Sequence, residues 1–217
     1  MWDKLKEQFN LLKLEKKKLF LITNSDKFIS KDEFLDAIAS SLQGGVEIIL
    51  FREKIIPDNV RVELGHKIRT LCDEYGATFI VNDRADIAHI VEADGVHLGA
   101  EDISISEARE ILGTNSIIGK SCKTPDEIID AMNEGADYAT FGPIYTTPSK
   151  INESVDMDDI RWIKNNIDIP VFITGDITNE NINEITQAGV DKIALTDAIM
   201  YSRIPEHSAR KILKYLP

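Results

Sequence analysis

Two cations follow a short apolar segment with no turn residue between them. Residues 48–51 read Ile-Ile-Leu-Phe, which is typical of a buried strand, and Arg52, Glu53 and Lys54 come directly afterwards. Because side chains alternate along a strand, Arg52 and Lys54 share one direction with Leu50, and Glu53 takes the other. A guanidinium fork beside an ammonium suits an oligophosphate. The simpler alternative is a pair of ordinary loop charges, with Glu53 paired to a neighbour.

Two aspartates follow the next two apolar segments, one after each. Asn82 and Asp83 follow residues 78–81, and Asp102 follows residues 95–97. Mg²⁺ prefers a few carboxylates completed by substrate phosphate oxygens, so Asp83 and Asp102 are candidate magnesium ligands, and Asn82 can add an amide donor. The competing interpretation is that each aspartate caps the helix that follows it.

A long loop follows the apolar segment 138–141 and reads Gly-Pro-Ile-Tyr-Thr-Thr-Pro-Ser-Lys up to Lys150. The hydroxyls of Thr147 and Ser149 and the Lys150 ammonium suit phosphate capture followed by loop closure. A proline-rich turn with incidental polar residues is the alternative.

His97 lies inside a predicted strand, where we expect an internal hydrogen bond. Cys122 has no evident base partner, which disfavours a nucleophilic role.

Eight short strand candidates alternate with amphipathic helical segments. The strands are predicted at residues 19–23, 47–51, 78–81, 95–97, 116–119, 138–141, 170–174 and 192–195. The helices are predicted at residues 31–42, 59–74, 104–112, 125–134, 156–165 and 179–187. Several strands are apolar without alternation, as parallel strands covered on both faces are. Eight such units predict a single (β/α)8 TIM barrel, with a doubly wound open sheet as the alternative.

In such a barrel the functional residues lie at the carboxyl ends of the strands. Polar residues follow seven of the eight predicted strands, so we expect one shared site there. Its candidates are Arg52, Lys54, Asn82, Asp83, Asp102, Ser121, Thr147, Ser149, Lys150, Gly175, Thr196 and Asp197.

The composition restricts the partners. The formal net charge is −12, which disfavours nucleic acid and anionic membranes as partners. Two cysteines without metal-site spacing and the lack of a long apolar run fit a cytoplasmic protein. Residues 1–18 are predicted to be a helical extension before a barrel domain at 19–217. This helix either packs on the barrel or meets a membrane surface or partner. Homo-oligomerisation stays open.

Several phrases resemble the thiamine phosphate synthase and TenI-like family, over about residues 19–202. They are REK at 52–54, VND at 81–83, ADGVHLGAED at 93–102, GADYATFGPIYTTPSK at 135–150 and ITGDIT at 173–178. The resemblance implies a TIM barrel transferase of thiamine biosynthesis. This enzyme joins hydroxymethylpyrimidine diphosphate to thiazole phosphate and releases pyrophosphate.

The resemblance also implies residue roles. Arg52, Lys54, Asn82 and Lys150 would hold the diphosphate, Asp83 and Asp102 would bind Mg²⁺, and Ser121 would contact the pyrimidine. Arg52, Lys54, Lys150 and Ser121 would thus be the catalytic set. Thr147 and Ser149 would belong to the closing loop, and the residues facing the thiazole phosphate would be Gly175, Thr196 and Asp197.

The departures from the family pattern fall mainly in the second half of the site. Leu50 and Ala100 stand where the family has glutamines. Asp176 replaces the second glycine of a Gly-Gly turn, and Asp197 stands where a serine is expected. A carboxylate repels a phosphate, so this subsite looks altered. The alternatives are therefore a TenI-like tautomerase or an enzyme repurposed for a related phosphorylated molecule, and a non-catalytic ligand-binding barrel.

Overall fold

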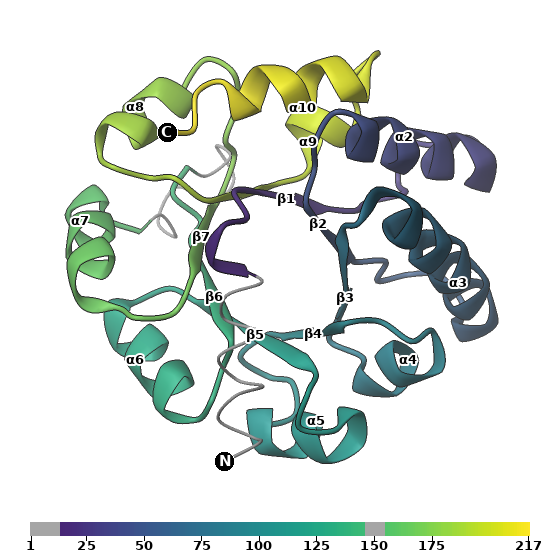
Figure 1. Ribbon diagram of the computed structural model, residues 1–217, viewed down its shortest axis with the longest axis horizontal. Helices are drawn as coiled ribbons and strands as arrows, with labels where there is room; N and C mark the ends of the chain where they lie inside the picture. The colour runs from purple at the N-terminus through teal and green to yellow at the C-terminus, as the bar shows by residue number, and fades with distance from the viewer. Residues whose placement is uncertain (1–13, 146–154) are drawn as a thin grey trace.

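The chain forms a closed barrel of eight parallel strands that pair in sequence order, as the (β/α)8 prediction requires (Figure 1). The computed structural model describes residues 14–145 and 155–217. The closed ring excludes the doubly wound open sheet. The strands are β1 (Leu19–Ile22), β2 (Ile48–Phe51), β3 (Thr78–Asn82), β4 (Gly95–Leu98), β5 (Ile117–Cys122), β6 (Tyr138–Phe141), β7 (Val171–Thr174) and β8 (Ile193–Leu195).

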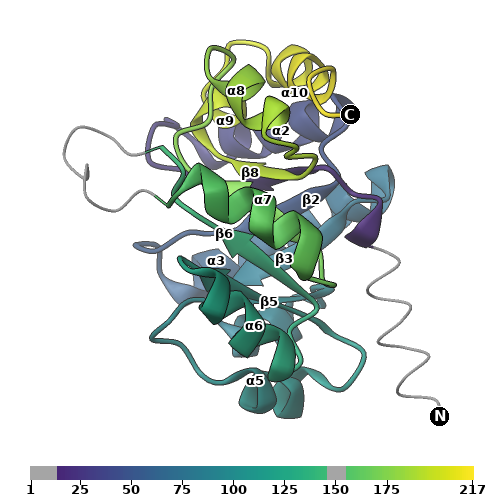
Figure 2. The same cartoon turned by 90° about the vertical axis from the view of Figure 1, so that its left-hand side faces the viewer.

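Helices surround this ring and cover its outer face (Figures 1 and 2). They are α2 (Lys31–Gln43), α3 (Asp58–Tyr75), α4 (Ala85–Ile90), α5 (Ile105–Leu112), α6 (Pro125–Asn133), α7 (Met157–Asn166), α8 (Ile182–Gln187), α9 (Asp197–Met200) and α10 (Pro205–Leu213). None of those within the described ranges is long and apolar enough to cross a membrane.

The strands bury side chains on both faces. Outward residues such as Ile49 and Phe51 join the large cluster between strands and helices, whereas Phe20, Leu50 and Phe172 belong to a smaller cluster inside the barrel. Leu50 therefore points inward, and alternation along the strand gives Arg52 the same direction. The strands are continuously apolar in sequence because both of their faces are buried, one by the helices and the other by the barrel interior.

The element boundaries differ from the predicted ones in ways that affect the site. Strand β5 continues to Cys122, so Ser121 lies within the strand, and Asn82 is the last residue of β3. The sequence analysis predicted no helix for α4, α9 or α10. Helices α4 and α9 have six and four residues, which is too short for a helical period to be recognisable.

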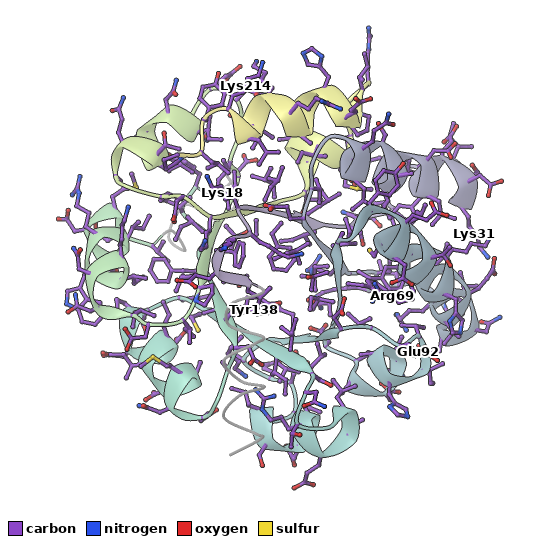
Figure 3. The ribbon with its side chains drawn as sticks, in the orientation of Figure 1. Lys18, Lys31, Arg69, Glu92, Tyr138 and Lys214 are labelled. Atoms are coloured by element: carbon purple, nitrogen blue, oxygen red, sulfur yellow. The ribbon has the colours of Figure 1, made fainter. Side chains whose placement is uncertain are left out.

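Two carboxylates at the amino end of the barrel have equivalent roles, in the similar phrases EADG at 92–95 and EGAD at 134–137. Asp94 precedes β4 and accepts hydrogen bonds from the Phe79 amide at 2.8 Å and from Arg69 at 3.0 Å (Figure 3). Asp137 precedes β6 and accepts from the Ile118 amide and from Arg109, both at 2.8 Å. Each aspartate thus satisfies the amide of the second residue of the preceding strand, which stabilises the end opposite the predicted site.

The predicted N-terminal helix lies largely outside the described residues, which begin at Leu14. Leu14 is fully buried and packs with the cluster inside the barrel. The last part of the predicted extension is therefore integral to the barrel core, although the sequence analysis placed the domain start at residue 19.

Candidate active site

Two cavities open at the carboxyl end of the strands, where the sequence analysis expected the site. One of about 270 Å³ lies over β2 and β3, and its lining includes Lys54, Asn82 and Asp83. Another of about 430 Å³ lies over β6 to β8, and its lining includes Gly175 and Asp197. A third cavity, of about 170 Å³, is lined by apolar residues of α7 and by the opposite ends of β7 and β8. Its position away from the rim argues against a catalytic role.

Asp83 and Asp102 come together, as their strand positions predicted. A side-chain hydrogen bond links them. Burial, this hydrogen bond and the charge of Asp102 raise the pKa of the Asp83 carboxyl, and the nearby charges of Lys54 and Arg52 partly oppose the shift. Two neighbouring carboxyl groups disfavour the state in which both are ionised, and a proton or a cation between them relieves this repulsion.

Neither aspartate caps a helix, so the competing interpretation fails for both. The N-cap residue of α4 is Arg84, with no side-chain capping bond, and α5 is capped by Ser104 in a capping box with Glu107. Asp102 instead accepts a hydrogen bond from the Gly99 amide at 2.6 Å.

The backbone of Asp83 is unusual and fits this position. Its φ of 62° is in the left-handed region, which aspartate tolerates better than most residues do. Its amide donates to the His97 carbonyl at 2.8 Å. Over residues 14–145 and 155–217, no group of three or more metal-type side chains exists. The donor set is therefore a carboxylate pair, which suits a cation that keeps other oxygen ligands.

Arg52 and Lys54 flank the carboxylate pair and form no ion pair within the described part of the chain. Two further arginines, Arg61 and Arg84, line the first cavity together with Lys54 and Asp83, and sequence reasoning missed both. Arg61 lies in the first turn of α3, and Arg84 comes just after Asp83. Arg61 lies in a helix, so a search for cations at strand ends does not find it. Arg84 lies near a strand end but forms ion pairs with Asp58 and Asp86, so its sequence position does not reveal a role in binding phosphate.

Glu53 points away from Arg52 and anchors the neighbouring loop. Its buried carboxylate accepts from the Thr23 hydroxyl at 3.0 Å and from the amide and hydroxyl of Ser25. Burial raises the pKa of Glu53, although these hydrogen bonds oppose the shift. The Thr23 hydroxyl in turn accepts from the Arg52 amide at 3.0 Å. Glu53 therefore hydrogen-bonds to its neighbours Thr23 and Ser25 and does not neutralise Arg52 or Lys54.

Ser121 and His97 meet near the carboxyl ends of β4 and β5. His97 is buried in β4, as expected, and its Nε2 lies 2.8 Å from Ser121 Oγ, while its Nδ1 lies 3.0 Å from the Tyr138 hydroxyl. Burial lowers the pKa of His97 to about 4, with smaller contributions from Lys120 and Arg52. The ring is therefore neutral near pH 7. Ser121 itself is exposed at the rim.

The second cavity contains Asp176 and Asp197, two of the four residues that depart from the family pattern. Gly175 has a φ of +140°, and a Cβ there would lie 2.5 Å from the Ile144 amide nitrogen, so glycine is required. Thr196 precedes α9 and Asp197 begins it. The Asp197 carboxylate lies 3.3 Å from Lys27 Nζ, with both side chains more than 60 % exposed. A cation therefore accompanies the carboxylate that sequence reasoning considered alone.

Three predicted residues, Thr147, Ser149 and Lys150, lie outside the described residues. Their phosphate-binding role stays a prediction. The described loop residue Tyr145 lines the second cavity and donates to Glu184 at 2.8 Å.

Comparison with known proteins agrees with this architecture. The family model for thiamine monophosphate synthase matches residues 19–199. A thiamine-phosphate synthase from Natronomonas pharaonis is 35 % identical over 198 residues, covering 89 % of this chain and 92 % of that protein. A solved thiamine phosphate pyrophosphorylase from Pyrococcus furiosus superposes with a TM-score of 0.82 at 33 % identity, covering 97 % of this chain and 96 % of that one.

Other relatives are longer. The thiamine-phosphate synthase from Synechocystis is 36 % identical over 205 residues, which cover 94 % of this chain and 58 % of that protein. The chain thus spans little more than half the length of several curated relatives it matches. The match over most of its own length is sufficient for classification: the chain belongs to the thiamine monophosphate synthase family.

Proposed function

We propose that the chain is a thiamine phosphate synthase that joins hydroxymethylpyrimidine diphosphate to thiazole phosphate and releases pyrophosphate. The observation that carries this proposal is the Asp83–Asp102 carboxyl pair beside Arg52 and Lys54, two cations without an ion-pair partner among the described residues. A tautomerase that handles no diphosphate has no use for this combination.

The carboxylate pair fits Mg²⁺. Asp83 and Asp102 would hold the ion, whose remaining ligands would be diphosphate oxygens and water. When bound, Mg²⁺ would supply charge neutralisation at the leaving diphosphate. The closeness of the two carboxyl groups supports this assignment, because a cation between them would relieve the repulsion of two ionised carboxylates.

The protein's own groups would then favour bond breaking. Arg52 and Lys54, with Lys150 from the predicted closing loop, would stabilise the charge that develops on the diphosphate as the carbon–oxygen bond breaks. The bonding electrons leave with the diphosphate, and a pyrimidine-methyl cation remains. The thiazole nitrogen then donates its lone pair to that carbon. Asn82 would bind a diphosphate oxygen, and Ser121 would contact the pyrimidine ring.

The second cavity would accept the thiazole phosphate. Lys27 beside Asp197 supports this, since the ammonium offsets part of the carboxylate repulsion. Gly175 and Thr196 would contribute contacts on the same side. Both cysteines are free and buried, which agrees with a reducing cytoplasm as the site of the reaction.

The test is a direct one. Purified protein is incubated with both substrates and Mg²⁺, and thiamine phosphate is detected by mass spectrometry. We expect product that disappears in Asp83→Asn and Asp102→Asn and persists in Asp130→Asn, a matched control on the exposed side of α6. Full activity in both site variants would contradict the metal assignment.

The altered second cavity favours one alternative, an enzyme that passes the pyrimidine to another acceptor. Asp176 and Asp197 both line that cavity and would suit an uncharged or cationic group. Pyrophosphate with Mg²⁺ should raise the melting temperature under either transfer reaction and leave it unchanged for a tautomerase. Clear stabilisation without thiamine phosphate would direct the search to other acceptors.

A further inference from the structure

A buried chain of hydrogen bonds runs from the barrel interior to the rim. Tyr138 lies inside the barrel, 1 % exposed, with its ring against Phe20 and Phe172 (Figure 3). Its hydroxyl lies 3.0 Å from His97 Nδ1, and His97 Nε2 lies 2.8 Å from Ser121 Oγ. These hydrogen bonds connect Tyr138, which lies in the barrel interior, to Ser121, which we place against the pyrimidine.

The fold makes room for this arrangement at one glycine. A Cβ at Gly119 would lie 2.1 Å from Cζ of the Tyr138 ring and 2.5 Å from its hydroxyl oxygen. Gly119 lies on β5, two residues before Ser121. The Tyr138 and His97 rings stack, with centroids 5.5 Å apart and planes 25° apart. The tyrosine is thus held in one position, with its hydroxyl against Nδ1.

Donor counting selects one tautomer of His97. Among the described residues the buried ring has only hydroxyl partners and no carboxylate acceptor, so one nitrogen donates and the other accepts. In the described part of the chain the Tyr138 hydroxyl has no acceptor other than Nδ1. If Nδ1 carried the hydrogen, the buried Tyr138 O–H would have no acceptor, which is unfavourable. The favoured arrangement has Tyr138 donating to Nδ1, with the hydrogen on Nε2.

This tautomer decides what Ser121 can offer. With Nε2–H donating, Ser121 Oγ accepts from His97 and its own hydroxyl hydrogen stays available. Thr140 Oγ1, at 3.4 Å from Nε2, can share the same hydrogen. In the other tautomer the Ser121 hydrogen would be used on Nε2, and the serine could only accept.

We propose that Tyr138 is a positioning residue that fixes the Nε2–H tautomer of His97 and so leaves the Ser121 hydroxyl free to donate to a hydrogen-bond acceptor on the substrate. A ring nitrogen of the pyrimidine is the class of acceptor that suits this donor. The identity of the ligand rests on the proposed function, whereas the tautomer does not.

The first experiment observes the tautomer without any substrate. In full-length protein with ¹⁵N-labelled histidine, the four histidines are assigned with single variants, and the Nδ1 and Nε2 signals of His97 are compared. We expect a protonated Nε2 and an unprotonated Nδ1 in the wild type, and a mixed population in Tyr138→Phe. Tyr75→Phe, which removes an exposed hydroxyl at the end of α3, should change nothing. A wild-type Nδ1–H tautomer, or an unchanged population in Tyr138→Phe, overturns the proposal.

The second experiment measures function with variants that mimic each nitrogen. His97→Gln can place an amide N–H near the position of Nε2 and should retain the donor to Ser121, whereas His97→Asn reaches only toward Tyr138. We expect Tyr138→Phe and His97→Asn to raise the KM for the pyrimidine diphosphate about tenfold, the loss of one hydrogen bond, with the KM for the thiazole phosphate unchanged. The KM of His97→Gln for the pyrimidine diphosphate should stay within about threefold of the wild-type value. Equal effects of the two His97 variants would overturn the proposal, whereas an inactive wild type would refute the proposed function and leave the NMR result to decide the tautomer.

Discussion

Replacing Asp83 with asparagine should stabilise the metal-free protein while abolishing Mg²⁺-dependent turnover. Asp83 shares a hydrogen bond with Asp102, and burial together with that neighbour raises the pKa of its carboxyl. Asparagine has nearly the same shape without the charge. It also tolerates the φ of 62° at this position, so the backbone need not change.

The magnitude follows from the charges around Asp83. Two unit charges about 4 Å apart repel each other by about 4 kcal/mol at an effective dielectric constant of about 20, which is an upper limit here. The proton between the carboxyls, the nearby Arg52 and Lys54, and partial exposure of Asp83 all reduce it. We therefore expect a net gain of about 1 kcal/mol, a rise of roughly 2–4 °C in Tm for a chain of this size.

The gain should depend on pH in a defined direction. Because the pKa of Asp83 is raised in the folded state, the native protein retains this proton at pH values where the unfolded chain has lost it. Wild-type stability therefore falls as pH rises from the ordinary aspartate pKa through the folded one. The advantage of Asp83→Asn should be absent in acid and largest above that window.

The assay compares thermal unfolding with EDTA and with Mg²⁺ plus pyrophosphate. Ligand at about 100 times its Kd should stabilise the wild type by about 2.7 kcal/mol and the variant far less, so the order of stability reverses. Asp130→Asn should respond to the ligand as the wild type does. A variant less stable than wild type in EDTA above pH 7, or equally stabilised by Mg²⁺ and pyrophosphate, would refute the reasoning.

Three other perturbations address different parts of the chain. Asp137→Ala should destabilise the fold by about 3–5 kcal/mol, because the Ile118 amide and Arg109 lose a buried charged acceptor. The KM values of the folded enzyme should not change. Denaturant titration measures the loss of stability, and steady-state kinetics measures the KM values. Asp197→Ser should tighten thiazole phosphate binding, by about threefold to tenfold since the site is exposed and Lys27 is released to the ligand; calorimetry that finds weaker binding would contradict this. Lys150→Ala should lower kcat by about 100-fold or more if its ammonium stabilises the leaving diphosphate, and single-turnover kinetics would detect this loss.

Much of the candidate site could be predicted because strand ends in a parallel barrel converge. The place of Asp83 after β3 and of Asp102 after β4 was enough to predict that they meet, since neighbouring strands end at the same rim. The inward direction of Arg52 followed from alternation with Leu50, whose burial inside the barrel agrees.

Other features depended on contacts between residues distant in sequence. Lys27 and Asp197 are 170 residues apart and meet only because β1 and β8 close the ring. Strand order alone could not reveal that a cation accompanies this carboxylate, because Lys27 lies in a loop whose path is set by packing.

The sequence by itself determined the class of fold, the end of the barrel where the candidate site lies, and the set of charged residues there. These depend on periodicity and chain order, which are local properties. Only the tertiary structure decided that Tyr138 lies under His97 and that His97 contacts Ser121. That chain of contacts depends on side-chain packing inside the barrel, where Gly119 leaves the space that the Tyr138 ring fills.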